Sequence, residues 1–415
     1  MTIRSDLSPP STRTIHELIE WLASFGETDK NGVTRLLYSA PWLEAQLAIK
    51  NKMMTTGFDT FFDDAGNLFG RLSGTDTDAP VILTGSHIDS VVNGGKYDGS
   101  YGIIASLLAA SMLLSKYGRP RKTIEVVSLC EEEGSRFPIT FWGSGSITGA
   151  YSDQDPSSLY DKEGISLKQA MEDAGFGVGD HPAPRRNDID CFIELHIEQG
   201  NDLELSDKSI GIVQSIVGQR RYHIQVQGKS NHAGTTPMQN RQDAMAASAE
   251  LITKLTNKAK SIDPHFVATV GKIEAKPNTP NVIAGEVIFS LDLRHPDLNM
   301  LDSYCADMKK LFEQAEAQSN VKITAEPWTN VTPVEMDSTI SSLAYQITEQ
   351  KRLPAQYMFS GAGHDAQMFG SAIPASLIFV PSRDGISHAP DEFTELIDLQ
   401  NGIAVLSDML YDLAY

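Results

Sequence analysis

Four short apolar runs along the chain have the length and composition of buried β-strands. Each is rich in aliphatic and β-branched residues and is followed by a polar residue, a glycine or a proline. The runs cover residues 81–84, 124–130, 191–195 and 375–380. A longer apolar stretch, residues 103–114, follows the first run and suits a helix. This alternation of strands and helices predicts an α/β fold.

The pattern changes near residue 212. From there, strand-like alternation and helical periodicity follow one another in the order β, α, β, β, α, β, which is typical of a ferredoxin-like α/β sandwich. The six segments are residues 221–228, 242–259, 266–273, 282–294, 300–318 and 321–326, and a further strand-like run, 212–218, precedes them. A chain of 415 residues is also too long for one ordinary core. We therefore predict an inserted ferredoxin-like domain of residues 212–329. The remaining residues, 1–211 and 330–415, are predicted to form a discontinuous catalytic domain with a mixed, mostly parallel sheet.

Side chains that can bind metals occur at or after the ends of the four apolar runs. In open α/β sheets, sites form outside the carboxyl ends of the strands, so these side chains are expected to converge. Two divalent cations that share one carboxylate need about this set of ligands, and the neighbouring Glu132 is left over to handle the proton of a water molecule. The five candidate ligands are His87, Asp98, Glu133, His196 and His388.

Each of these residues also has a simpler interpretation when it is taken alone. His87 could be a structural histidine, residues 131–133 could be a solvated charge run, and Asp98 could be a turn aspartate among glycines. The joint pattern favours the metal centre. Asp89 follows His87 by two residues and could lie on the same face, where a carboxylate would fix the imidazole; the alternative is a helix or turn cap.

Charge and composition limit the classes of partner. The formal net charge is −20 and the pI is near 4.9, which argues against binding to nucleic acid or to anionic membrane surfaces. No uncharged apolar stretch reaches the roughly 20 residues of a membrane span, and the N-terminus has no apolar signal-peptide core. Three cysteines without paired spacing fit a reducing compartment. We expect a cytoplasmic protein with neither nucleic acid nor membrane as partner.

Seven sequence blocks resemble the amidase, or hydantoinase–carbamoylase, branch of the dinuclear metallopeptidase superfamily. They are GSHIDSVVNGGKYDG, EEEGSRFP, ELHIEQG, GKSNHAGTTPM, PNTPNVIAGEVIFSLDLRH, SGAGHDAQ and DGISHAPDE. Within this branch, SFGETDKNGVTRLLYS, FWGS and IVGQRRY are most similar to the members that act on allantoate. The matching blocks extend from about Ser24 to the C-terminus. The resemblance implies a metallopeptidase-like catalytic domain.

The resemblance also implies a role for each candidate ligand. Asp98 would bridge two divalent metal ions per subunit, zinc or manganese. His87 and His196 would complete one metal site, and Glu133 and His388 would complete the other. The residues alone do not separate zinc from manganese, because imidazole and carboxylate ligands suit both.

Three further residues acquire expected catalytic roles from the resemblance. Glu132 would be the general base, Asp89 would support His87, and His232 in the GKSNHAGTTPM block would stabilise the developing oxyanion. The inserted domain would mediate formation of a homodimer. His232 would then act either within its own subunit or across to the partner subunit.

The expected substrate is a small anionic ureido compound, and allantoate is the leading candidate. Hydrolysis of a ureido C–N bond would release ammonia and carbon dioxide. Arg294 suits a carboxylate and Asn281 a ureido group, but 13 residues separate them, so in a regular strand they would face opposite sides. The other candidate substrate residues are His364, Gln199 and Arg220. Arg294 could instead form a structural salt bridge, and residues 219–221 could be a solvated turn.

Three other functions compete with this interpretation. The nearest is hydrolysis of N-carbamoyl-L-amino acids or of β-ureidopropionate, for which the same metals and base would serve. A metallo-exopeptidase is opposed by the NHAGTTP and HIEQG blocks. A non-catalytic binding protein is opposed by the presence of Glu132 and of all five candidate ligands.

Overall fold

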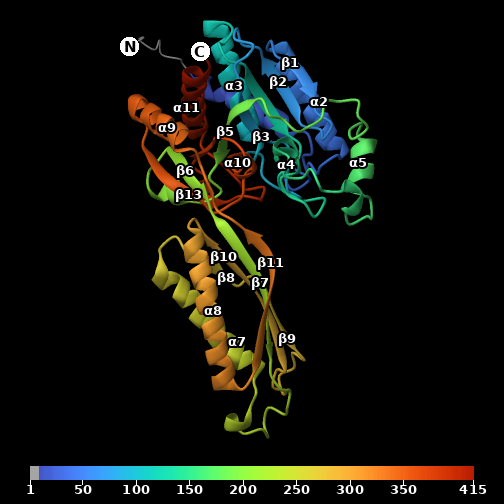
Figure 1. Cartoon of the computed structure of the whole chain (residues 1–415), viewed down its shortest axis with the longest axis vertical. Helices are drawn as coiled ribbons and strands as arrows, with labels where there is room; N and C mark the ends of the chain where they lie inside the picture. The colour runs from blue at the N-terminus through green and yellow to red at the C-terminus, as the bar shows by residue number, and fades with distance from the viewer. Residues whose placement is uncertain (1–8) are drawn as a thin grey trace. The chain divides into compact units, whose positions relative to one another are not determined.

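The computed structural model describes residues 9–415 and contains two compact units (Figure 1). The larger unit comprises the chain up to Gln214 together with Glu335–Tyr415, and the smaller unit is Ser215–Val334. The smaller unit is thus inserted in the sequence of the larger one. The corresponding predicted segment was 212–329.

The larger unit is built on a mixed β-sheet. Among residues 9–415, nine strands form this sheet in the order β1-β2-β4-β3-β5-β14-β6-β12, with β13 paired to β6. Their bounds are β1 (Asp59–Phe62), β2 (Leu68–Leu72), β3 (Val81–His87), β4 (Ile124–Leu129), β5 (Ile189–Ile197), β6 (Ile210–Ile216), β12 (Val334–Glu335), β13 (Ala355–Ser360) and β14 (Ala375–Val380). The four central strands β4, β3, β5 and β14 run parallel, and β2 and β6 flank them antiparallel.

Helices pack on both faces of the central strands. On β5, Phe192 and Glu194 meet α10: Phe192 stacks on Phe369, and Glu194 accepts a hydrogen bond from the N–H of Ala366. Alternate residues such as Leu195 point to the opposite face and belong to the core with α3 and α11. The helices are α1 (Thr12–Ala23), α2 (Ala40–Thr55), α3 (Ser100–Tyr117), α4 (Trp142–Thr148), α5 (Leu167–Asp173), α6 (Asp202–Leu205), α9 (Ser338–Lys351), α10 (Asp365–Gly370) and α11 (Leu396–Ala414).

The predicted α/β class with a mixed sheet is confirmed. The four apolar runs coincide with the central strands β3, β4, β5 and β14. Two of these strands extend further than the apolar runs, because the backbone of the polar residues at their ends continues the ladder pairing with the neighbouring strand. His87 is therefore the last residue of β3, and His196 is the second-last residue of β5.

The smaller unit has its own antiparallel sheet and its own core. Its five strands are arranged β11-β7-β10-β8, with β9 also on β10, and α7 and α8 cover one face (Figure 1). The bounds are β7 (Gly218–Gln227), α7 (Ala244–Ile262), β8 (Val267–Thr269), β9 (Ile273–Lys276), β10 (Glu286–His295), α8 (Leu298–Ser319) and β11 (Lys322–Val331). This order matches the predicted β, α, β, β, α, β, with the third segment divided into β8 and β9. The run at 212–218 instead falls mostly in β6, which pairs with β14 in the nine-stranded sheet.

Candidate metal centre

Parallel strands bring the carboxyl ends of β3, β4 and β5 to one edge of the larger sheet. In the strand register, His87 at the end of β3 lies beside Leu129 at the end of β4. His196 near the end of β5 lies beside Phe379 of β14. Because both histidines occupy strand ends, their positions follow from regular sheet geometry. Both rings are almost completely buried, with 2% and 1% of the side chains exposed.

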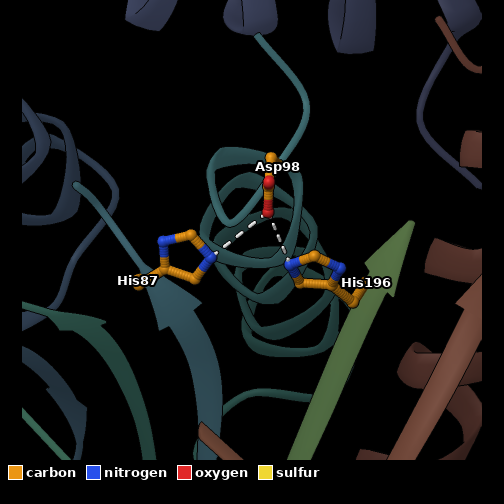
Figure 2. Close-up of side chains that lie close together, drawn as sticks. All are labelled: His87, Asp98 and His196. Atoms are coloured by element: carbon orange, nitrogen blue, oxygen red, sulfur yellow. Dashed lines mark ion pairs between the residues drawn. The ribbon is translucent and has the colours of Figure 1, made fainter. Parts of the chain in front are cut away.

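Asp98 lies between these two imidazole rings (Figure 2). Its Oδ1 is 3.3 Å from His87 Nε2 and 3.2 Å from His196 Nε2. The residue immediately precedes Gly99, the N-cap of α3, whose φ of 62° is in the left-handed region. A Cβ atom on Gly99 would lie 2.4 Å from the carbonyl oxygen of His87, so only glycine allows this close approach.

A second pair of side chains faces the other carboxylate oxygen of Asp98. His388 Nε2 is 3.3 Å from Asp98 Oδ2 and 3.5 Å from Glu133 Oε1. The ligand atoms of Asp98, Glu133 and His388 lie within 4.8 Å of one another, and so do those of His87, Asp98 and His196. The structure therefore brings all five predicted ligands together around the two oxygens of one carboxylate.

This group of side chains fits divalent metals. Glu133 Oε1 is buried and has no hydrogen-bond partner among the described residues. A buried carboxylate oxygen without a partner is costly unless a cation binds it. Three imidazoles and two carboxylates are ligands that suit Zn²⁺ or Mn²⁺, and Asp98 could bridge two ions.

The charges at the centre shift the pKa of Asp98 strongly. Burial by itself would raise this pKa, but hydrogen bonds from His196, His388 and His87 outweigh burial and hold it well below its ordinary value. The lowered pKa favours the ionised form of the Asp98 carboxylate. Burial acts to lower the pKa of His87, yet hydrogen bonds to Asp89 and Asp98 raise it well above normal.

Asp89 links the ligand His87 to the loop that follows β4. Its Oδ1 is 3.3 Å from His87 Nδ1, on the side of the ring that faces away from Asp98. The same carboxylate accepts hydrogen bonds from the backbone N–H groups of Glu132 and Glu133, at 3.0 and 3.1 Å. The structure thus places Asp89 against both His87 and the Glu132–Glu133 backbone, and its supporting role stays a prediction.

Glu132 has the properties expected of a general base. Among the described residues, none donates a hydrogen bond to its carboxylate. Burial raises the pKa of Glu132 well above its ordinary value; the charge of His87 opposes this shift, and Glu133 and Asp365 add to it. A carboxylate that is not held by donors and has a raised pKa can accept and release a proton.

A buried arginine, Arg35, connects the segments that follow His87 and Asp98 in the chain. Its side chain donates to the carbonyl of Ile88 at 2.9 Å and to Ser100 Oγ at 2.5 Å, and its backbone N–H donates to Ser90 Oγ at 2.9 Å. Only 1% of Arg35 is exposed. Sequence reasoning missed this residue, although it lies in one of the stretches that resembles the family.

Gln199 and Glu392 contact the centre on the side of His388. The amide of Gln199 donates to Asp98 Oδ2 at 3.0 Å and to Ser387 Oγ at 3.2 Å. Gln199 was predicted to bind substrate, and the structure places it beside the carboxylate of Asp98. Glu392 was not predicted; it follows His388 by four residues, and its carboxylate also reaches the backbone of Asp98.

His364 lies behind His196, completely surrounded by protein. Its ring centroid is 4.6 Å from that of His196, and its Nε2 has no hydrogen-bond partner among the described residues. Burial lowers the pKa of His364 well below normal, and the charge of His196 lowers it further. The side chain is 2% exposed, so the predicted contact with substrate stays a prediction.

Two predicted residues, His232 and Asn281, lie on adjoining loops of the smaller unit. His232 forms an isolated bridge with Val282, and the carbonyl of Asn281 accepts from the N–H of Ala233 at 3.0 Å. Both side chains are exposed. Gly234 N–H donates to His232 Nδ1 at 3.0 Å, which leaves the proton of the neutral ring on Nε2. Strand β10 begins only at Glu286, so the strand-parity argument does not apply to Asn281.

The predicted arginines lie on opposite faces of the sheet in the smaller unit. Arg294 donates to Asp292 at 3.0 and 3.1 Å, and Arg221 donates to the same carboxylate at 2.8 Å. Arg220 points to the other face, where it bonds Val331 O and Asp302. Arg221 was not among the candidate substrate residues. Strand parity could have indicated its orientation. Arg220 has the same parity as the buried Ile224, so Arg221, the next residue, must point to the opposite face of the sheet.

None of the helices among residues 9–415 combines the length and the apolarity that a membrane crossing requires.

Comparisons with known proteins agree with this geometry. A family model described as Peptidase family M20/M25/M40 matches residues 83–412. An allantoate amidohydrolase from Bacillus subtilis is 48% identical over 402 residues, which cover 97% of this chain and 98% of the relative. An allantoate amidohydrolase from Escherichia coli is 44% identical over 403 residues, with 97% and 98% covered.

The solved structures include close matches to the whole chain. A crystal structure of an amidase of the hydantoinase/carbamoylase family from Burkholderia multivorans superposes with a TM-score of 0.94 at 32% identity, and 99% of each chain is covered. The predicted resemblance to this branch is confirmed.

Proposed function

We propose that this chain, which belongs to peptidase family M20/M25/M40, is an amidohydrolase that cleaves a ureido C–N bond of allantoate and releases ammonia and carbon dioxide. One observation carries the proposal: Asp98 presents one oxygen to His87 and His196 and the other to His388. The chain is also 48% and 44% identical to two allantoate amidohydrolases over nearly the whole length of each.

The proposed cofactor is a pair of divalent metal ions, zinc or manganese, bridged by Asp98. His87 and His196 would hold one ion, and Glu133 and His388 would hold the other. When bound, the ions lower the pKa of an attacking water molecule and polarise the ureido carbonyl, which two adjacent nitrogens make a poor electrophile.

The proton transfers are assigned to Glu132. Its carboxylate takes a proton from the attacking water and later gives it to the leaving nitrogen. The raised pKa supports both directions of transfer, because a weakly acidic carboxylate holds a proton long enough to deliver it. Asp89 keeps Glu132 in place through the backbone N–H and holds His87 through Nδ1.

Substrate recognition is assigned to the smaller unit. Arg294 and Arg221 flank Asp292, so two guanidinium groups are held on one face by a shared carboxylate. A bidentate guanidinium is the side chain best suited to a substrate carboxylate. His232 presents Nε2–H, a donor suitable for a developing oxyanion, and Asn281 on the adjoining loop suits a ureido group.

The smaller unit is also the proposed site of homodimer formation. Several large hydrophobic side chains are exposed in it, including Val267, Ile273 and Trp328. Exposed apolar side chains of this kind are candidates for burial against a second copy of the chain.

Product analysis tests the proposed function directly. The purified chain would be supplied with Zn²⁺ or Mn²⁺ and assayed for ammonia release from allantoate, with N-carbamoyl-L-amino acids, β-ureidopropionate and dipeptides as parallel substrates. We expect allantoate to give the highest kcat/KM. A higher kcat/KM with N-carbamoyl-L-amino acids would replace allantoate by the nearest alternative substrate class.

A subunit-mixing experiment tests the role of His232. We expect His232→Ala to lower turnover and to leave the metal content unchanged, since the residue donates to substrate and binds no metal. If His232 acts across a dimer, mixing His232→Ala with Glu132→Gln subunits should restore part of the activity. No recovery in mixed dimers that have formed would favour action within one subunit.

A further inference from the structure

The loop that carries His388 lacks regular secondary structure around this residue. His388 itself has a φ of 56°, in the left-handed region that non-glycine residues adopt at a cost of about 1 kcal/mol or more. Its side chain is 49% exposed. Something besides local backbone preference must therefore hold the imidazole toward Asp98.

Glu392 connects this loop to the turn that contains Asp98. Its Oε1 accepts from the backbone N–H groups of Tyr97 and Asp98, at 2.9 and 3.1 Å. Its Oε2 accepts from the hydroxyl of Ser387, the residue before His388, at 2.8 Å. One carboxylate thus connects two segments that are 294 residues apart in the chain.

Packing around Glu392 requires this side chain to stay in place. Glu392 is 2% exposed, so an unpaired carboxylate here would be costly. A Cβ atom on Gly95 would lie 2.1 Å from Glu392 Oε1, which shows that the Tyr97 turn passes directly over the carboxylate. Ser387 also accepts from the amide of Gln199, which donates to Asp98 Oδ2, so a second path joins the same two segments.

We infer that Glu392 is a positioning residue that holds His388 against Asp98 and thereby sets the affinity of the metal site formed by Asp98, Glu133 and His388. The inference rests on the proposed two-metal centre. Glu392 acts through the length of its side chain, which spans from the Asp98 turn to Ser387. Hydrogen-bonding partners of this kind typically change metal affinity 10–100-fold when they are removed.

Three substitutions at Glu392 show whether metal affinity depends on the connection that the side chain makes between the two segments or only on its negative charge. Glu392→Gln keeps the length and loses the charge: its carbonyl can accept from Tyr97 and Asp98, and its amide can donate to Ser387 Oγ. Glu392→Asp keeps the charge and is one methylene shorter, so it cannot span both segments. Glu392→Ala removes both properties. Glu395→Gln is the matched control, because Glu395 is exposed in the same loop and its carboxylate, within residues 9–415, pairs only with Arg383.

The experiment measures the affinity of each variant for Zn²⁺ by competition with a chromophoric chelator, and the metal content after dialysis. We expect Glu392→Gln and Glu395→Gln to retain two ions, as the wild type does. For each ion, their affinity should be within roughly threefold of the wild-type affinity. We expect Glu392→Ala and Glu392→Asp to bind one ion roughly 10–100-fold more weakly. The weakened ion should be the one lost in His388→Ala, and combining the two substitutions should weaken it no further.

Other outcomes would overturn the inference in distinguishable ways. If Glu392→Asp retained wild-type affinity and Glu392→Gln did not, charge and not bridging would be responsible. If Glu392→Ala bound both ions normally, Glu392 would have no positioning role. Should Glu392→Ala fail to fold, Ser387→Ala removes the other end of the same connection, the hydroxyl that donates to Glu392. This substitution must then lower the affinity for the same ion. A wild-type chain that binds fewer than two ions would instead contradict the proposed centre itself.

Discussion

The two halves of the candidate centre are built in different ways. His87 and His196 stand on neighbouring parallel strands, and 2% and 1% of their side chains are exposed. His388 stands on a loop in a left-handed conformation, and 49% of its side chain is exposed. The first half is fixed by the hydrogen-bond ladders of the sheet. The second half depends on a few side-chain hydrogen bonds, chiefly those of Glu392 and Gln199.

This difference teaches where the centre is rigid and where it can adjust. Strand ends in the middle of a sheet open only when much of the unit unfolds, whereas exposed loops open at low free-energy cost. The half formed by His87 and His196 should therefore bind its ion firmly, and the half formed by Glu133 and His388 should exchange its ion more readily.

The largest expected effect is on turnover and leaves metal binding in both halves unchanged. Glu132→Gln removes the proposed base and leaves every ligand in place. We expect kcat for allantoate to fall by roughly 10²–10⁴-fold. Two bound ions per subunit should remain, measured by elemental analysis. Glu163→Gln, an exposed glutamate in a loop, is the matched control. A Glu132→Gln enzyme with near-normal kcat would remove Glu132 from the mechanism.

The next effect should fall on the half formed by His87 and His196. In Asp89→Asn, one carboxylate oxygen becomes an NH₂ group, which then faces a backbone N–H of Glu132 or Glu133 without an acceptor. We expect the affinity for one ion to drop roughly 10–100-fold. The chelator titration should show that this ion is the one lost in His87→Ala. Weakening of the other ion alone would show that Asp89 acts chiefly through the backbone of Glu133 and not through His87.

Release kinetics should reveal the two halves in the wild-type chain. When an excess of chelator is added to the two-metal protein, we expect two separate phases of metal release. The faster phase should correspond to the exposed half and should disappear in His388→Ala. A single phase that accounts for both ions would show that the two halves open together.

The smallest effect concerns the chain just after the His388 loop. Burial raises the pKa of Asp398 from its ordinary value of 3.8 to about 6, and Glu395 contributes to the shift. The folded chain thus holds this proton more tightly than the unfolded chain, so stability is lost as the pH rises from about 4 to about 6. Asp398→Asn lacks this loss. Its stability relative to wild type should improve by about 1 kcal/mol between pH 4 and pH 7, allowing for partial exposure.

Thermal unfolding midpoints of the metal-free proteins at the two pH values would measure this change. If the variant and wild type differ by the same amount at pH 4 and pH 7, Asp398 has an ordinary pKa in the folded chain.

The fold and three of the five candidate ligands could be predicted for the same physical reason. Apolar runs mark the central strands, and ligands near the ends of parallel strands must converge at one edge of the sheet. His87, Glu133 and His196 follow this rule closely. His388 lies eight residues beyond β14, where the position depends on the course of a loop; the resemblance to a family, and not the periodicity, supplied its role.

The supporting residues could not be predicted from local pattern. Glu392 accepts hydrogen bonds from a turn 294 residues away, and Arg35 reaches Ile88 and Ser100 through tertiary contacts alone. In the smaller unit, strand parity would have separated Arg220 from Arg221, but the start of β10 at Glu286 depends on turn geometry that the sequence pattern did not reveal.

The central claim is that Asp98 bridges two metal ions, one in each half. Crystals of the chain grown with Zn²⁺ and measured at the zinc absorption edge would test it through anomalous scattering. We expect two peaks per subunit about 3.5–4 Å apart, one beside His87 and His196 and the other beside Glu133 and His388, with Asp98 between them. A single peak, or two peaks that do not share Asp98, would contradict the account.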